Sequence, residues 1–208
     1  RRYKGARPLP TLKPQPIRID GSFDDWKAVE PEFRDTIRDP VQRQHPGWEG
    51  SGPYVNQTGR NDIIAAKVSY DDETIYFYAR TREPLSPATN ANWMLLFIDA
   101  DRNATNGWLG YDFVVNRSAV RERSTVIERH RGPGYRWSSP KTVSFRAAGN
   151  ELEVAIAREA LGWASLPEYL DFKWADNIPQ TGDWSDFTLY GDAAPNDRFN
   201  YRATFPTQ

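Results

Sequence analysis

The chain has 208 residues, a formal net charge of −1 at pH 7 and no cysteine. These values exclude a disulfide framework, and they argue against a nucleic-acid partner held by a broad positive field. No apolar run reaches the roughly 20 residues that a membrane-spanning helix needs, so no membrane span is expected. The 8 Trp, 10 Tyr and 10 Phe, together with 14 Gly and 16 Pro, are typical of an all-β domain.

The start of the chain is rich in proline. Residues 1–14 are predicted to be an extended leader or linker, and residues 15–208 a single packed domain. The chain starts abruptly at Arg1, so we expect a leader or an upstream domain to precede it.

The stretch IRIDGSFDDW opens the predicted domain. Alternation of Ile17 and Ile19 predicts a short first strand, and the Asp-Gly pair that follows predicts a turn. We interpret Trp26 as an apolar plug at the end of the core, reached through one short helical turn.

Strand patterns become clear in the middle of the chain. Ile63–Tyr70 and Thr74–Arg82 flank an acidic turn and predict a hairpin. Trp93–Asp99 is apolar throughout, which predicts a central strand covered on both faces. Further strands are expected at residues 109–116, 119–130, 141–148, 152–156 and 170–174, with a last strand holding Phe187 and Leu189. About ten antiparallel strands with minimal helix predict a jelly-roll-like β-sandwich of two packed sheets.

Five segments follow one another in an order that resembles the family 9 carbohydrate-binding modules and the wider DOMON-like group. They are IDGSFDDW, DDETIYFYARTRE, LLFIDAD, ELEVAIAREALG and FKWADN, and the likeness covers roughly residues 15–192. The resemblance implies a non-catalytic module of a secreted or cell-surface bacterial polysaccharide-degrading enzyme. Its implied partners are a poly- or oligosaccharide ligand and a covalently linked catalytic domain.

Tryptophans are the candidate sugar-binding residues. In the family two tryptophans clamp the sugar ring, and the resemblance assigns these roles to Trp93 and Trp184. Loop tryptophans are further candidates, because pyranose faces stack on exposed aromatic rings. These are Trp48, Trp108 and Trp137.

The sequence departs from the family at its polar sugar-binding positions. Leu95, Val114 and Trp174 stand where the family has groups that hold the sugar hydroxyls. The usual hydroxyl-binding set is therefore missing, and any sugar site in this chain is expected to be built differently.

The segment DADRNATNGW is a candidate metal site. Asp99, Asp101 and Asn103 alternate, a spacing of oxygen ligands that Ca²⁺ accepts, and Asp112 completes a shell if the next strand folds back. The alternative is a plain hairpin loop whose Asp and Asn side chains bond to loop amides. Family 9 modules often bind structural calcium, so the resemblance favours Ca²⁺ as a structural cofactor.

Two other functions stay open. A structural or interdomain β-sandwich without sugar binding fits the missing polar set. A haem-binding electron carrier, as found among DOMON-like domains, would use Met94, the single methionine. Catalysis has little support, because no recognisable acid pair or serine–histidine motif occurs.

Overall fold

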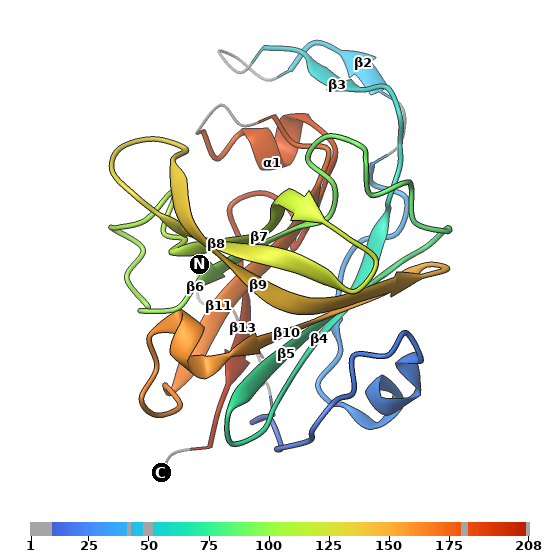
Figure 1. The fold of residues 1–208 in the computed structure, drawn as a ribbon. Coiled ribbons are helices and arrows are strands. Elements are labelled where there is room, and N and C mark those ends of the chain that lie inside the picture. The colour runs from blue at the N-terminus through green and yellow to red at the C-terminus, as the bar shows by residue number, and fades with distance from the viewer. Residues whose placement is uncertain (1–9, 41–42, 48–51, 180–182, 207–208) are drawn as a thin grey trace.

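The computed structural model describes residues 10–40, 43–47, 52–179 and 183–206. One antiparallel sheet dominates it (Figure 1). Its strands lie in the order β1 (Phe33–Arg34), β4 (Ile63–Tyr70), β5 (Thr74–Thr81), β10 (Glu151–Ala157), β9 (Trp137–Ala148), β8 (Ser124–His130), β7 (Phe113–Val120), β6 (Leu95–Asp99), β11 (Tyr169–Asp176) and β12 (Asp192–Ala194). A further strand, β13 (Tyr201–Thr204), pairs with β11 off this path.

The remaining elements are short. β2 (Arg43–His45) and β3 (Tyr54–Asn56) form a separate hairpin. The helices are η1 (Phe23–Ala28), η2 (Arg158–Leu161) and α1 (Asp186–Leu189). In Figure 1 the β2–β3 hairpin and α1 lie at the same end of the main sheet. In the described part of the chain, no helix is long and apolar enough to cross a membrane.

The main sheet curls into a nearly closed barrel. Where its two sides meet, the backbone N–H of Ile63 at the start of β4 donates to Oδ2 of Asp192 in β12, at 2.6 Å. No ladder joins β4 to β12 in the described residues, and we call this junction the seam. The all-β class, the antiparallel pairing and the minimal helix are confirmed. The predicted division into two sheets is not what the pairing shows, because the hydrogen bonds pass from β1 to β12 without a break.

Side chains alternate across the barrel wall as the sequence predicts. In β5, Ile75 and Phe77 point into the main apolar core, while Tyr76 and Tyr78 lie on the outer face. β6 is buried over its whole length, because Leu96 and Ile98 face the barrel interior and Leu95 and Phe97 face an outer aromatic cluster. The prediction of a central strand covered on both faces is therefore confirmed.

The stretch after the leader is anchored to the outer face of the barrel instead of forming the predicted strand at residues 17–19. The backbone N–H of Gly21 and the indole N–H of Trp26 both donate to the carboxylate of Glu153, at 3.0 and 2.9 Å. The Trp26 ring is 1% exposed and stacks on Tyr78, with 5.1 Å between ring centroids. Trp26 is thus a core plug as predicted, and the Asp-Gly turn brings the chain to its buried carboxylate partner.

Two boundary predictions change in the structure. Leu12, inside the predicted leader, is 2% exposed in the main core, and its N–H donates to the carbonyl of Thr204. The predicted last strand with Phe187 and Leu189 is wrong, because these residues lie in α1. The carboxylate of Asp183 accepts from the N–H two residues later and starts a helical turn where apolar alternation alone suggested a strand.

Candidate functional site

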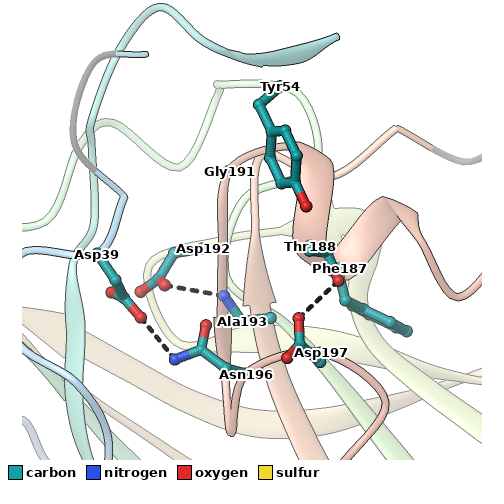
Figure 2. A pocket seen from close by; sticks show the side chains of 9 residues that line it. All are labelled: Asp39, Tyr54, Phe187, Thr188, Gly191, Asp192, Ala193, Asn196 and Asp197. Carbon is teal, nitrogen blue, oxygen red and sulfur yellow. Dashed lines mark hydrogen bonds between the residues drawn. The ribbon is translucent and has the colours of Figure 1, made fainter. Parts of the chain in front are cut away.

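An open pocket of about 330 Å³ lies beside the seam (Figure 2). It combines carboxylates, an amide, a hydroxyl and aromatic rings from the segment after β1, the β2–β3 hairpin, α1, β12 and the loop after β12. We call it the Asp192 pocket. Its lining residues are Asp39, Tyr54, Phe187, Thr188, Gly191, Asp192, Ala193, Asn196 and Asp197.

The backbone at Gly191 fixes the entry into β12. Its φ is +46°, and an added Cβ would lie 1.9 Å from the carbonyl oxygen of Asp176. Only glycine fits such a close approach of two backbone segments. The side-chain amide of Asn56 in β3 donates to the carbonyls of Gly191 and Pro40, at 3.2 and 3.1 Å. These contacts tie the hairpin to the chain segment that carries Asp192.

Asp192 is the buried carboxylate of the pocket, with 3% of its surface exposed. Its two oxygens accept from the N–H groups of Ile63, at 2.6 Å, and Ala193, at 2.9 Å. Burial, and after it the nearby charge of Asp39, raises the pKa of Asp192 well above its ordinary value. The carboxylate of Asp192 therefore accepts one hydrogen bond from each side of the seam.

Polar groups on the rim of the pocket are held in place by one another. The side-chain amide of Asn196 donates to Asp39 at 2.6 Å and, at 3.4 Å, to Asp35. The hydroxyl of Thr188 donates to Asp197 at 2.7 Å. Figure 2 shows Tyr54 on the hairpin side of the pocket, with its phenol directed towards the α1–β12 side. The pocket thus presents ordered oxygen acceptors beside an aromatic ring.

Beneath the pocket lies a buried lysine. Lys173 in β11 is fully buried, its ammonium group donates to the carbonyl of Pro195, and it lies 4.9 Å from the centroid of the Phe187 ring. Burial lowers the pKa of Lys173 to about 7, against the opposing influence of Asp35. Burial, followed by repulsion from Asp39, raises the pKa of Asp35 to about 7. Burial therefore disfavours the charged forms of both Lys173 and Asp35.

Two of the tryptophans predicted to bind sugar lie in cores. Trp93 is 2% exposed, and its indole N–H donates to the carbonyl of Ser86 at 2.8 Å. Trp108 is 3% exposed and packs against Phe97 and Tyr135 in the outer aromatic cluster. A stacking platform needs an open ring face, so these buried positions correct the prediction for both residues.

The other predicted platforms differ in exposure. Trp137 is half-buried against Phe97 and Trp108, and Trp48 lies outside the described residues. Trp184 is 41% exposed and lies on the turn immediately before α1, two helical residues of which line the Asp192 pocket. Trp184 thus has the exposed ring that a stacking platform needs, and it lies only a few residues before the α1 residues that line the pocket.

The positions where the family holds sugar hydroxyls do not share a face. Leu95 and Val114 belong to the outer aromatic cluster, whereas Trp174 points into the barrel interior. All three are fully buried. Met94, the residue considered for haem, is also fully buried in the main core.

The structure brings together two acidic groups. Asp99, Asp101 and Asp112, which we call the loop cluster, have carboxylate oxygens within 4.8 Å of one another. The amide oxygen of Asn103, the fourth predicted metal ligand, accepts from the N–H and the hydroxyl of Thr105, at 3.1 and 2.6 Å.

The second group was not predicted. Asp35, Asp39 and Asp192, which we call the seam cluster, also have carboxylate oxygens within 4.8 Å of one another. Asp35 and Asp39 follow β1, while Asp192 lies on β12, so no short spacing in the sequence indicates that the three residues form a cluster. The nearest signal is the run of Asp, Asn and Pro at residues 192–197, which reads equally well as a loop.

Comparison with protein-family models, with curated proteins and with solved structures found no match for this chain. The resemblance to family 9 carbohydrate-binding modules stays a prediction from the sequence.

Proposed function

We propose that this protein is a non-catalytic carbohydrate-binding module that holds a saccharide in the Asp192 pocket. The observation that carries the proposal is the convergence of Asp39, Asp197, Asn196 and the Tyr54 ring around one open cavity. Carboxylates and amides orient sugar hydroxyls by hydrogen bonding, and an aromatic ring packs against the C–H face of a pyranose. Trp184 supplies a second, exposed ring beside α1.

The sequence resemblance extends this proposal to the biological setting. We place the module in a secreted or cell-surface bacterial protein that degrades polysaccharides, covalently linked to a catalytic domain. The saccharide contacts come from the pocket and its rim, because the family's own polar positions hold buried Leu95, Val114 and Trp174. A structural Ca²⁺ is part of the same proposal, since two acidic clusters have oxygens close enough to share an ion.

Glycan-array screening followed by calorimetry tests the function. Short oligosaccharides are expected to bind with dissociation constants near the millimolar range, because the pocket is open and stacking on each ring contributes only about 1 kcal/mol. Asp197→Asn and Trp184→Ala should each weaken binding by about tenfold, the equivalent of about 1.4 kcal/mol. Leu109→Ala is the matched control, because Leu109 is similarly exposed, at 40%, but belongs to the loop at residues 100–112.

The competing function is a structural β-domain without a ligand. Its support is the burial of the three apolar residues at the family's polar positions. An absence of binding to any plant, algal or bacterial glycan by protein with a normal melting curve would favour it. Equal losses in Leu109→Ala and Trp184→Ala would show that the pocket is not the sugar site.

A further inference from the structure

The part of the chain that forms β7, β8 and β9 is strongly basic. Residues 117–146 contain eight Arg or Lys and two Glu, whereas the whole chain has 27 basic and 28 acidic side chains. The rest of the chain is therefore acidic, and the positive charge is concentrated on three neighbouring strands (Figure 1). A concentrated positive region attracts anionic ligands even when the net charge of the protein is close to zero.

A second open cavity, of about 220 Å³, lies on these strands beside η2. Its lining includes Arg129, Arg131 and Lys141, and we call it the basic pocket. Glu159 is the acidic residue among the described residues that line it, so three cations face one carboxylate. The basic pocket shares no lining residue with the Asp192 pocket.

Strand pairing places the basic pocket at an end of the barrel interior. Arg129 in β8 pairs with Phe113 in β7, and Lys141 in β9 pairs with Ile127 in β8. Residues paired in this way share a face of the sheet. Phe113 and Ile127 belong to the main core, so both cationic side chains lie on the inner face of the barrel wall.

These positions give the pocket an apolar floor and a charged rim. Phe113 and Ile127 line it as well, and the guanidinium carbon of Arg129 lies 5.8 Å from the centroid of the Phe113 ring. An inward-facing row that only filled the barrel would end in another apolar side chain. A barrel mouth that combines apolar walls with a few charged groups is instead a common place for a ligand.

The cations of the basic pocket are not used by the fold. Arg129, Arg131 and Lys141 are exposed, and none of them forms a salt bridge in the part of the chain that the structure describes. Arg117 and Arg60, by contrast, are paired with the buried carboxylates of Glu128 and Asp176. Three positive charges around one cavity repel one another, and an anionic ligand removes that repulsion.

We propose that the basic pocket binds an acidic sugar residue of a polysaccharide. The carboxylate or sulfate group of the sugar pairs with Arg131 and Lys141, and the C–H groups of the ring lie against the apolar floor. A cavity of about 220 Å³ encloses one sugar residue, whereas a nucleic acid needs an extended positive groove that follows its backbone. The inference rests on the proposed function, because the ligand is a saccharide, but it uses a separate pocket.

Calorimetry with paired oligosaccharides tests the inference. Tetragalacturonate is compared with its neutral methyl ester, and a sulfated carrageenan tetrasaccharide with its desulfated form, so that the two anionic groups are measured separately. At least one acidic form should bind the wild type about tenfold more tightly than its neutral partner. Arg131→Gln and Lys141→Gln should each lower this affinity about tenfold. Melting curves check that each variant folds.

Arg123→Gln is the matched control. It removes the same charge from the same basic segment, but Arg123 is exposed and precedes β8, at the opposite end of that strand from Arg131. This variant should change the affinity for the acidic sugar by less than twofold. An equal loss in Arg123→Gln would overturn the inference, because a general positive field would then explain the binding. Tetraglutamate or a tetranucleotide that binds as tightly as the acidic sugars would overturn it too.

The outcomes also separate this inference from the proposed Asp192 site. If neutral and acidic sugars bind equally well, the acidic-sugar inference fails and the proposed function stands. If acidic sugars bind tightly, lose affinity in Arg131→Gln and keep it in Asp197→Asn, the basic pocket is supported independently of the Asp192 pocket. If none of the four oligosaccharides binds, the acidic-sugar inference fails, and the glycan array decides the proposed function.

Discussion

The loop cluster and the seam cluster each consist of three aspartates, but the hydrogen-bond partners of their carboxylates differ. In the loop cluster the carboxylates are surrounded by donors. Oδ2 of Asp112 accepts from the N–H groups of Ala100 and Asp101, and Oδ1 of Asp99 accepts from those of Arg102 and Asn103. In the seam cluster Oδ2 of Asp35 is buried and lacks a donor in the described residues, and the buried hydroxyl of Tyr201 likewise lacks a partner there.

The comparison shows that proximity of acids does not by itself define a cation site. Backbone N–H groups stabilise a carboxylate by hydrogen bonding to its charged form, as they do in the loop. At the seam the two backbone N–H groups of Ile63 and Ala193 donate to Asp192, whereas Oδ2 of Asp35 is buried without a donor in the described residues.

The largest expected effect tests the structural role of the loop cluster. Asp112→Ala removes the acceptor shared by two backbone N–H groups at the base of the loop, and should lower the free energy of unfolding by about 1–3 kcal/mol. Asp101→Ala, at an exposed position, should change it by about 0.5 kcal/mol or less. Urea denaturation in EDTA measures both. Equal losses would mean that the loop is held by something other than these hydrogen bonds.

An intermediate effect is expected at Tyr201. Tyr201→Phe removes a buried hydroxyl without a partner, so in EDTA the variant should be more stable than the wild type by about 1 kcal/mol. Urea denaturation in EDTA gives the result. A loss of stability in EDTA would show that the hydroxyl already has a partner.

The sequence predicts those features that depend on neighbouring residues. The bounds of β4, the facing of β5 and the burial of β6 follow from local alternation. The proximity of Asp99, Asp101 and Asp112 was predicted, because these residues lie within and at the two ends of the loop that joins β6 to β7. Residues that are this close in the sequence are also close in the folded structure.

The seam cluster could not be predicted, because its position depends on how the sheet closes. Asp39 and Asp192 are more than 150 residues apart in the sequence, and they lie close together because the strands between them form one nearly closed sheet. An alternation pattern within one strand specifies which of its side chains face the core, but it does not specify the curvature of the whole sheet. The same reason explains why two packed sheets were predicted where one continuous sheet is found. Trp93 and Trp108 were misassigned because ring exposure also depends on closure.

The smallest expected effect concerns how burial changes the pKa of a carboxyl group. At the seam, burial and repulsion between carboxylates both raise the pKa of Asp35. Glu153 is a fully buried carboxylate that accepts from Gly21 and Trp26. Burial raises the pKa of Glu153 above its ordinary 4.5, so the folded protein keeps this proton at a pH where the unfolded chain has lost it.

The sign of the pH effect follows directly. The contribution of Glu153 to stability is largest below pH 4.5 and is lost as the pH rises through the folded-state pKa. Glu153→Gln does not ionise, so its stability should fall less than that of the wild type as the pH rises above 4.5. Glu122→Gln, at an exposed position, should follow the wild-type curve. Melting curves at several pH values, in EDTA, measure the difference. Parallel curves for wild type and Glu153→Gln would mean that burial shifts the pKa of Glu153 too little to affect stability.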